Sequence, residues 1–141
     1  MSRQNLINPI TGSIYFGIIP PLKLSGVMRP EGQIVLPMGR HVGPNRGFGA
    51  NHIWAEHQNE MLQAGWTIFD HVPAYVASIV RTGTPLYFEG ASYRNTRLIA
   101  VRSSTGTAIL ELREQRDEVI WSVVTAFSGN KTHGTRVGAV R

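Results

Sequence analysis

The sequence predicts an α+β domain in which two helices pack on one face of a roughly four-stranded antiparallel sheet. Between residues 51 and 81, apolar residues recur every three or four positions, which is the period of a helix. After residue 85 the period changes to two, in four short segments that polar turns separate. These turns are too short for the crossover that parallel strands require, so we expect antiparallel pairing.

The first fifty residues are rich in residues that favour turns. They hold eight of the fifteen glycines and six of the eight prolines, with apolar runs at 13–19 and 33–38 and a turn-rich segment at 43–49. This composition indicates an irregular, partly extended segment. We therefore divide the chain into an arm or linker, residues 1–32, and a more regular domain, residues 33–141, within a single globular unit.

Two helices are predicted in the middle of the chain. The first covers residues 52–64, where Asn51 suits the N-cap position and a glycine follows the last helical residue. The second covers residues 72–81, with Asp70 as a candidate cap and Pro73 in the first turn.

Four strands are predicted in the second half of the chain, and they cover residues 86–89, 97–102, 108–113 and 119–127. Side chains along a strand alternate between its two faces. In the last strand this alternation places Thr125 on the same face as Trp121 and Val123, where it is the one hydroxyl among bulky apolar side chains.

The charge of the chain favours a polyanionic partner. Fourteen Lys and Arg face nine Asp and Glu, which gives a net charge of +5, and twelve of the fourteen cations are Arg. The forked guanidinium of Arg matches phosphate well. RNA, DNA and acidic proteins are therefore the expected classes of partner.

Several function classes lack the residues they require. The chain has no cysteine, which excludes disulfides, thiolate metal sites and a cysteine nucleophile. It also lacks a Gly-x-Ser-x-Gly elbow, a Walker A motif and a dinucleotide fingerprint. The uncharged segment 5–22 is broken by three prolines, so we expect neither a spanning helix, a membrane anchor nor a signal peptide there.

Two histidines in the first predicted helix are candidates for proton transfer. His52 lies in the first turn, where the helix dipole lowers the pKa of an imidazole and keeps it available as a base. His57 lies about 140° further around the helix, on the stripe of Ile53 and Met61, where a histidine buried in the core is an equally good interpretation. The His-x4-His spacing does not suit a metal ion, so we expect no metal site at these histidines.

At this point the residues suggest a family. The segment 39–57 (GRHVGPNRGFGANHIWAEH), the two predicted helices and the terminal segment 121–127 (WSVVTAF) follow one another in a recognisable order. Together they resemble the barnase–EndoU–colicin–RelE superfamily of ribonucleases, above all its polymorphic-toxin and phage-encoded branches. The likeness covers about residues 33–128.

The resemblance implies that residues 33–141 form a nuclease domain that cleaves RNA without a metal and needs no cofactor, with tRNA as the expected substrate. A base removes the proton of a 2′-hydroxyl, whose oxygen attacks the adjacent phosphorus to leave a 2′,3′-cyclic phosphate and a 5′-hydroxyl. His52 or His57 would be the base or the acid. Arg97 or Arg102 would neutralise the charge that develops on phosphorus, and Thr125 would hydrogen-bond it. The candidates for substrate binding are Arg46, Arg94, Ser122 and Trp54.

The resemblance also implies a biological setting. The domain would be delivered into the cytoplasm of a target bacterium as a toxin of contact-dependent growth inhibition. A cognate immunity protein, expected to be acidic, would cover the basic cleft in the producing cell. The alternative is a non-catalytic nucleic-acid-binding module that uses Arg side chains and stacking by Trp, Tyr and Phe.

Overall fold

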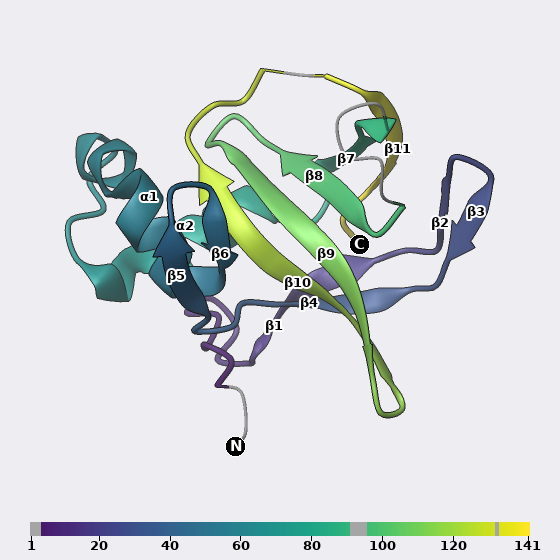
Figure 1. The fold of residues 1–141 in the computed structure, drawn as a ribbon, viewed down its shortest axis with the longest axis horizontal. Coiled ribbons are helices and arrows are strands. Elements are labelled where there is room, and N and C mark those ends of the chain that lie inside the picture. The colour runs from purple at the N-terminus through teal and green to yellow at the C-terminus, as the bar shows by residue number, and fades with distance from the viewer. Residues whose placement is uncertain (1–3, 91–95, 132) are drawn as a thin grey trace.

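The structure is a computed structural model that describes residues 4–90, 96–131 and 133–141. It has the predicted α+β class: within these residues a seven-stranded sheet packs with two helices, and two short hairpins flank it (Figure 1). The strands of the sheet, in chain order, are β1 Tyr15–Ile19, β4 Gly32–Val35, β7 Pro85–Phe88, β8 Leu98–Arg102, β9 Thr107–Gln115, β10 Glu118–Phe127 and β11 Thr135–Ala139.

The antiparallel meander β7–β8–β9–β10 confirms the four predicted strands and their pairing. The extent of the predicted sheet was wrong, because the described strands lie in the order β1-β4-β10-β9-β8-β7-β11. Strand β4 pairs with β10 in parallel, so the sheet is mixed. The apolar runs at 13–19 and 33–38 thus supply two strands of the sheet, where the sequence predicts irregular structure.

The sheet curls until its first strand meets the end of the chain. The backbone N–H of Ile18 donates to the carbonyl of Arg141 at 3.3 Å, and the N–H of Arg141 donates to the carbonyl of Ile18 at 2.8 Å. Arg141 also forms an ion pair with Glu31, just before β4. Figure 1 shows the C-terminus beside β1. Residues 15–35 are therefore bound to the C-terminal residue, Arg141, as well as to β10.

Two hairpins lie outside the sheet: β2 Leu22–Leu24 pairs with β3 Val27–Arg29, and β5 Arg40–Gly43 pairs with β6 Arg46–Phe48. The second hairpin occupies the segment that the sequence predicts as turns, and it packs against the first helix. Gly47 permits this close packing, because a Cβ there would stand 2.3 Å from the carbonyl oxygen of Arg40 in the hairpin and 2.9 Å from Nδ1 of His52 in α1.

The helices are α1 Gly49–Gln63 and α2 Val72–Ile79, the latter preceded by the 3-10 turn η1 Phe69–His71. Both predicted helices exist, but their caps were wrong. The N-cap of α1 is Phe48, while Asn51 donates its side-chain amide to the carbonyl of Gly39 at 3.1 Å. Asp70 lies within η1 and caps nothing, whereas Pro73 does lie in the first turn of α2.

A β-bulge in β10 overturns the predicted face of Thr125. Val123 pairs with Leu110, but Thr125 pairs with the next residue of β9, Ile109, so Val124 is an extra residue without a partner in the ladder. Trp121, Val123 and Leu110 lie in the hydrophobic core. The bulge turns Thr125 away from that core, because an extra residue reverses the alternation of the side chains that follow it.

Candidate active site

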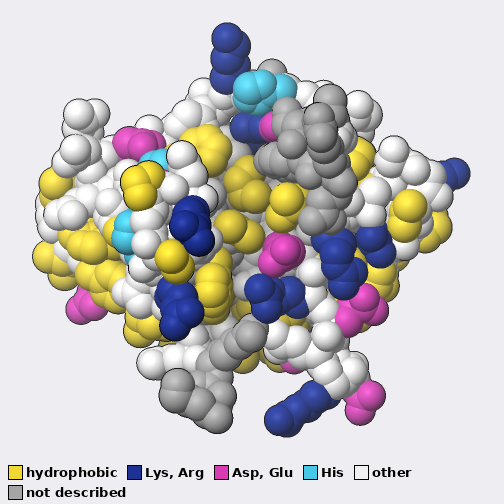
Figure 2. Space-filling model, in the orientation of Figure 1, with side chains coloured by type: hydrophobic (Ala, Val, Ile, Leu, Met, Phe, Trp, Pro, Cys, Tyr) yellow, Lys and Arg dark blue, Asp and Glu magenta, His cyan; other side chains and the backbone are white. Residues whose placement is uncertain are grey.

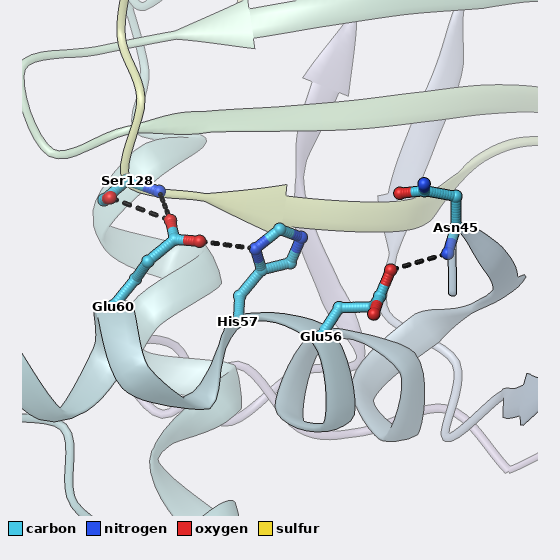
Figure 3. A network of polar contacts seen from close by, with 5 residues as sticks. All are labelled: Asn45, Glu56, His57, Glu60 and Ser128. Carbon is cyan, nitrogen blue, oxygen red and sulfur yellow. Dashed lines mark hydrogen bonds and ion pairs between the residues drawn. The ribbon is translucent and has the colours of Figure 1, made fainter. Parts of the chain in front are cut away.

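A hydrogen-bonded chain of three residues joins α1 to the end of β10 (Figure 3). Nδ1 of His57 lies 2.6 Å from one carboxylate oxygen of Glu60. The other oxygen accepts hydrogen bonds from the backbone N–H of Ser128 at 2.6 Å and from its hydroxyl at 2.8 Å. A carboxylate at Nδ1 places the ring proton on that nitrogen and leaves Nε2 as the acceptor. This is the arrangement that orients an imidazole as a base.

The path of the chain explains why α1 reaches this end of β10. Strand β4 pairs with β10 only at residues 120–122, so α1 lies beside the remaining part of β10. The backbone of α1 is kinked at His57, where φ is −124° and ψ is 19°. The imidazole lies beside the ring of Phe127, with 5.7 Å between the ring centroids. Its side chain is 22% exposed, so it contacts both protein and solvent.

Glu60 is held as a carboxylate by its neighbours. Burial raises the pKa of Glu60, but the hydrogen bonds from Ser128 and His57 outweigh burial and bring the pKa below its ordinary value of 4.5. Glu60 and Ser128 were not predicted from the sequence. The i, i+3 spacing of His57 and Glu60 on a helix is the signal that could have found the first of them.

The lowered pKa of Glu60 predicts an acid-sensitive contribution to stability. This contribution is fully present above the ordinary pKa and is lost as pH falls through the lower value of the folded state. We expect Glu60→Gln to lose less stability than the wild-type protein between about pH 7 and about pH 3, as measured by urea unfolding. Glu114→Gln, at an exposed carboxylate, should keep the wild-type dependence. Parallel curves for Glu60→Gln and the wild type would contradict this prediction.

The register of the sheet places Arg102 on the face that carries Thr125. Directly paired residues share a face, and Arg102 pairs with Thr107, which pairs with Phe127. In the adjacent row, Thr125 pairs with Ile109. Oγ1 of Thr125 is shielded from solvent and has no hydrogen-bond partner among the described residues. A buried hydroxyl without a partner costs about 1–3 kcal/mol, so a ligand oxygen that reached it would be stabilised.

Arg102 is 7% exposed and is already surrounded by protein groups. Its guanidinium forms an ion pair with Glu89, donates to the hydroxyl of Thr107 at 3.1 Å and lies 5.9 Å from the ring centroid of Tyr87. Burial lowers the pKa of Arg102, and the electrostatic interaction with Tyr87 partly offsets this shift. The structure thus places Arg102 on the face of the sheet that carries Thr125, with its charge largely neutralised by Glu89.

The other predicted arginines lie elsewhere. Arg97 stands opposite Leu112, a core residue, so it shares the face away from Thr125, and it forms an ion pair with Glu114 at 3.3 Å. Arg46 is exposed on β6. Arg94 lies outside the described residues.

His52 is part of a second histidine pair. Its Nδ1 lies 3.1 Å from Nδ1 of His41 on β5, with the rings stacked at 5.3 Å, so one ring must donate and the other accept. The predicted lowering of the pKa of His52 is present, but its main cause is burial, reinforced by His41 and His57 and opposed by Glu56. At 4% exposure, His52 joins the hairpin to α1 rather than facing solvent. His41 was missed, because nothing in the sequence relates β5 to the helix.

The last two residues predicted to bind substrate, Trp54 and Ser122, lie in different surroundings. Trp54 packs edge-on against Phe69, with 6.5 Å between ring centroids, and does not join the group beside β10. Ser122 lines a pocket of about 850 Å3 whose wall includes Phe48 and Arg113. The guanidinium of Arg113 lies over the ring of Phe48, 5.7 Å from its centroid. In the view of Figure 2, basic side chains are interspersed with acidic and apolar ones rather than gathered in one patch.

Among the described residues, no group of three or more His, Asp or Glu side chains is arranged to hold a metal ion. None of the helices in that part of the chain is long and apolar enough to cross a membrane. Comparisons with models of protein families, with curated proteins and with solved structures found no match.

Proposed function

We propose that this chain is a metal-independent endoribonuclease in which His57 is the general base. The observation that carries the proposal is the hydrogen-bonded chain His57–Glu60–Ser128 beside β10. A carboxylate that fixes the tautomer and the orientation of an imidazole makes it an effective base. The partly exposed ring of His57 favours it over His52, which is buried against His41.

The proposed reaction uses His57 and the side chains on the face of the sheet that carries Thr125. Nε2 of His57 takes the proton of a ribose 2′-hydroxyl, and the oxygen attacks the adjacent phosphorus. The bond from phosphorus to O5′ breaks, and the departing oxygen takes a proton from solvent, which yields a 2′,3′-cyclic phosphate and a 5′-hydroxyl. Thr125 donates to a non-bridging oxygen as charge develops there. Arg102 lies in the next row of the sheet, and its positive charge becomes available to the phosphate when substrate displaces Glu89.

The wider setting of the proposal rests on the resemblance alone. We propose tRNA as the substrate, delivery into a target bacterium, and an acidic immunity protein as the inhibitor. The formal charge of +5 is compatible with both the RNA and the acidic inhibitor.

The direct test is incubation of the protein with total RNA in the presence of EDTA. We expect discrete fragments that carry 2′,3′-cyclic phosphate and 5′-hydroxyl ends, because the proposed base acts without a metal. Treatment of the fragments with an enzyme that phosphorylates 5′-hydroxyls would identify those ends. If RNA remained intact at high protein concentration, with and without divalent cations, the ribonuclease proposal would be wrong.

One observation favours the second candidate, a non-catalytic nucleic-acid-binding module. Thr125 and Arg102 are both shielded from solvent, and Arg102 is paired with Glu89. Substrate would therefore have to displace neighbouring groups before either side chain could contact a phosphate. Saturable RNA binding without any cleavage would support this candidate over the first.

A further inference from the structure

We propose that the pocket beside Phe48 and Arg113 binds one unpaired nucleobase of the RNA, close to the phosphodiester that is cut. This inference rests on the proposed ribonuclease function and adds a substrate subsite to it. The pocket has a volume of about 850 Å3, and its wall includes Asn5, Phe48, Arg113, Arg116, Ile120 and Ser122.

The aromatic ring and the guanidinium provide a stacking surface. Phe48 and Arg113 form a cation–π pair whose centres lie 5.7 Å apart. Unpaired bases are bound in proteins by stacking on aromatic rings and on the planes of Arg side chains. Arg113 forms an ion pair with Glu111 at 3.4 Å, and both side chains are about one-third exposed. Such a pair is weak, so the guanidinium can adjust to a ligand at little cost.

The charge of the pocket favours a base over a phosphate. Its two arginines are balanced by Asp117 and Glu118, and Glu118 accepts a hydrogen bond from the hydroxyl of Tyr15 at 2.8 Å. A pocket without net charge has little attraction for a phosphodiester. A planar heterocycle, in contrast, gains from stacking, and its polar edge can hydrogen-bond to the side chains of Asn5 and Ser122 that line the wall.

The position of the pocket fits a subsite next to the proposed reaction. Ser122 and Thr125 lie on the same strand, and three residues of a strand span about 10 Å. The bulge at Val124 brings Thr125 to the face of β10 opposite Trp121 and Val123, and this is also the face of Ser122. One strand of RNA could therefore contact the pocket and the face of β10 that carries Thr125 at once.

The test measures binding of a fluorescently labelled, single-stranded 2′-O-methyl oligonucleotide of mixed sequence. This probe lacks a free 2′-hydroxyl, so the proposed reaction cannot consume it. We expect Phe48→Leu and Arg113→Gln each to raise the Kd about tenfold, because each removes part of the stacking surface. The matched control is Arg136→Gln, at an exposed arginine of β11, which should change the Kd by less than about twofold. Thermal unfolding of each variant establishes that it is folded.

The outcomes separate this inference from the ribonuclease proposal. Wild-type affinity in both Phe48→Leu and Arg113→Gln would overturn the subsite, and so would equally tight binding of a fully paired duplex of the same sequence. Cleavage of unmodified RNA is measured in parallel. Cleavage together with unchanged binding in the variants rejects the subsite alone. If the variants lose binding as expected but the wild type does not cleave RNA, the ribonuclease proposal is wrong and the site for unpaired bases stands.

Discussion

His57→Ala is expected to lower the rate of RNA cleavage by about a hundredfold to ten-thousandfold, the usual contribution of a general base. The proposed base is held by Glu60 and Ser128 beside β10, and an alanine cannot accept the proton of the 2′-hydroxyl. The measurement is the initial rate of cleavage of total RNA in EDTA under saturating and limiting RNA. The loss should appear in kcat rather than in KM alone, because a base acts on the reacting group.

Two variants make this result specific to His57. His133→Ala removes an exposed histidine from the segment after β10 and should cleave at the wild-type rate. His52→Ala should lower stability through loss of the His41 contact, but should retain cleavage in the fraction that is folded. Full activity of His57→Ala would show that His57 is not the base. A selective loss of cleavage in His52→Ala would instead assign the base to the buried pair of His52 and His41.

Arg102→Met is expected to destabilise the protein by about 3–5 kcal/mol, because it leaves the carboxylate of Glu89 buried without its partner. The double substitution Arg102→Met with Glu89→Gln should recover a large part of this loss, since it removes both charges. The free energies of unfolding come from urea titrations of the four proteins of this cycle. Equal losses in the single and the double variant would mean that the unpaired charge of Glu89 is not the cause of the loss.

An exposed pair provides the comparison for this cycle. Glu114→Gln breaks the ion pair with Arg97. The side chain of Glu114 is 58% exposed and that of Arg97 is 38% exposed, so the substitution should change stability by less than about 1 kcal/mol. Arg102 and Arg97 were equivalent candidates in the sequence. Burial distinguishes them, and burial depends on pairings that the spacing of arginines does not reveal.

The sequence predicts the part of the fold that depends on segments that are neighbours along the chain. The meander β7–β10 follows from alternating residues and short turns, and the two helices follow from their period. Strands β1 and β4 lie among glycines and prolines, and their pairing is set by contacts with β10 and with the end of the chain. No local pattern contains that information.

The candidate site divides in the same way. His57 could be selected from its place in the helix, but the hydrogen bonds from Ser128 to Glu60 span 68 positions. The predicted face of Thr125 was wrong for a different reason. Alternation along β10 holds up to Val123, and the extra residue Val124 then reverses it. A bulge arises from how two strands pair, so the residues of one strand do not predict it.

The junction between β1 and Arg141 has a kinetic consequence. The ion pair between Glu31 and Arg141 joins residues 110 positions apart, and the hydrogen bond between Tyr15 and Glu118 spans 103. Chains dominated by such distant pairings fold slowly, in about milliseconds to seconds, since much entropy is lost before these contacts form. We expect the hairpin of β9 and β10, whose strands are joined by residues 116–117, to form before the two ends of the chain close the sheet.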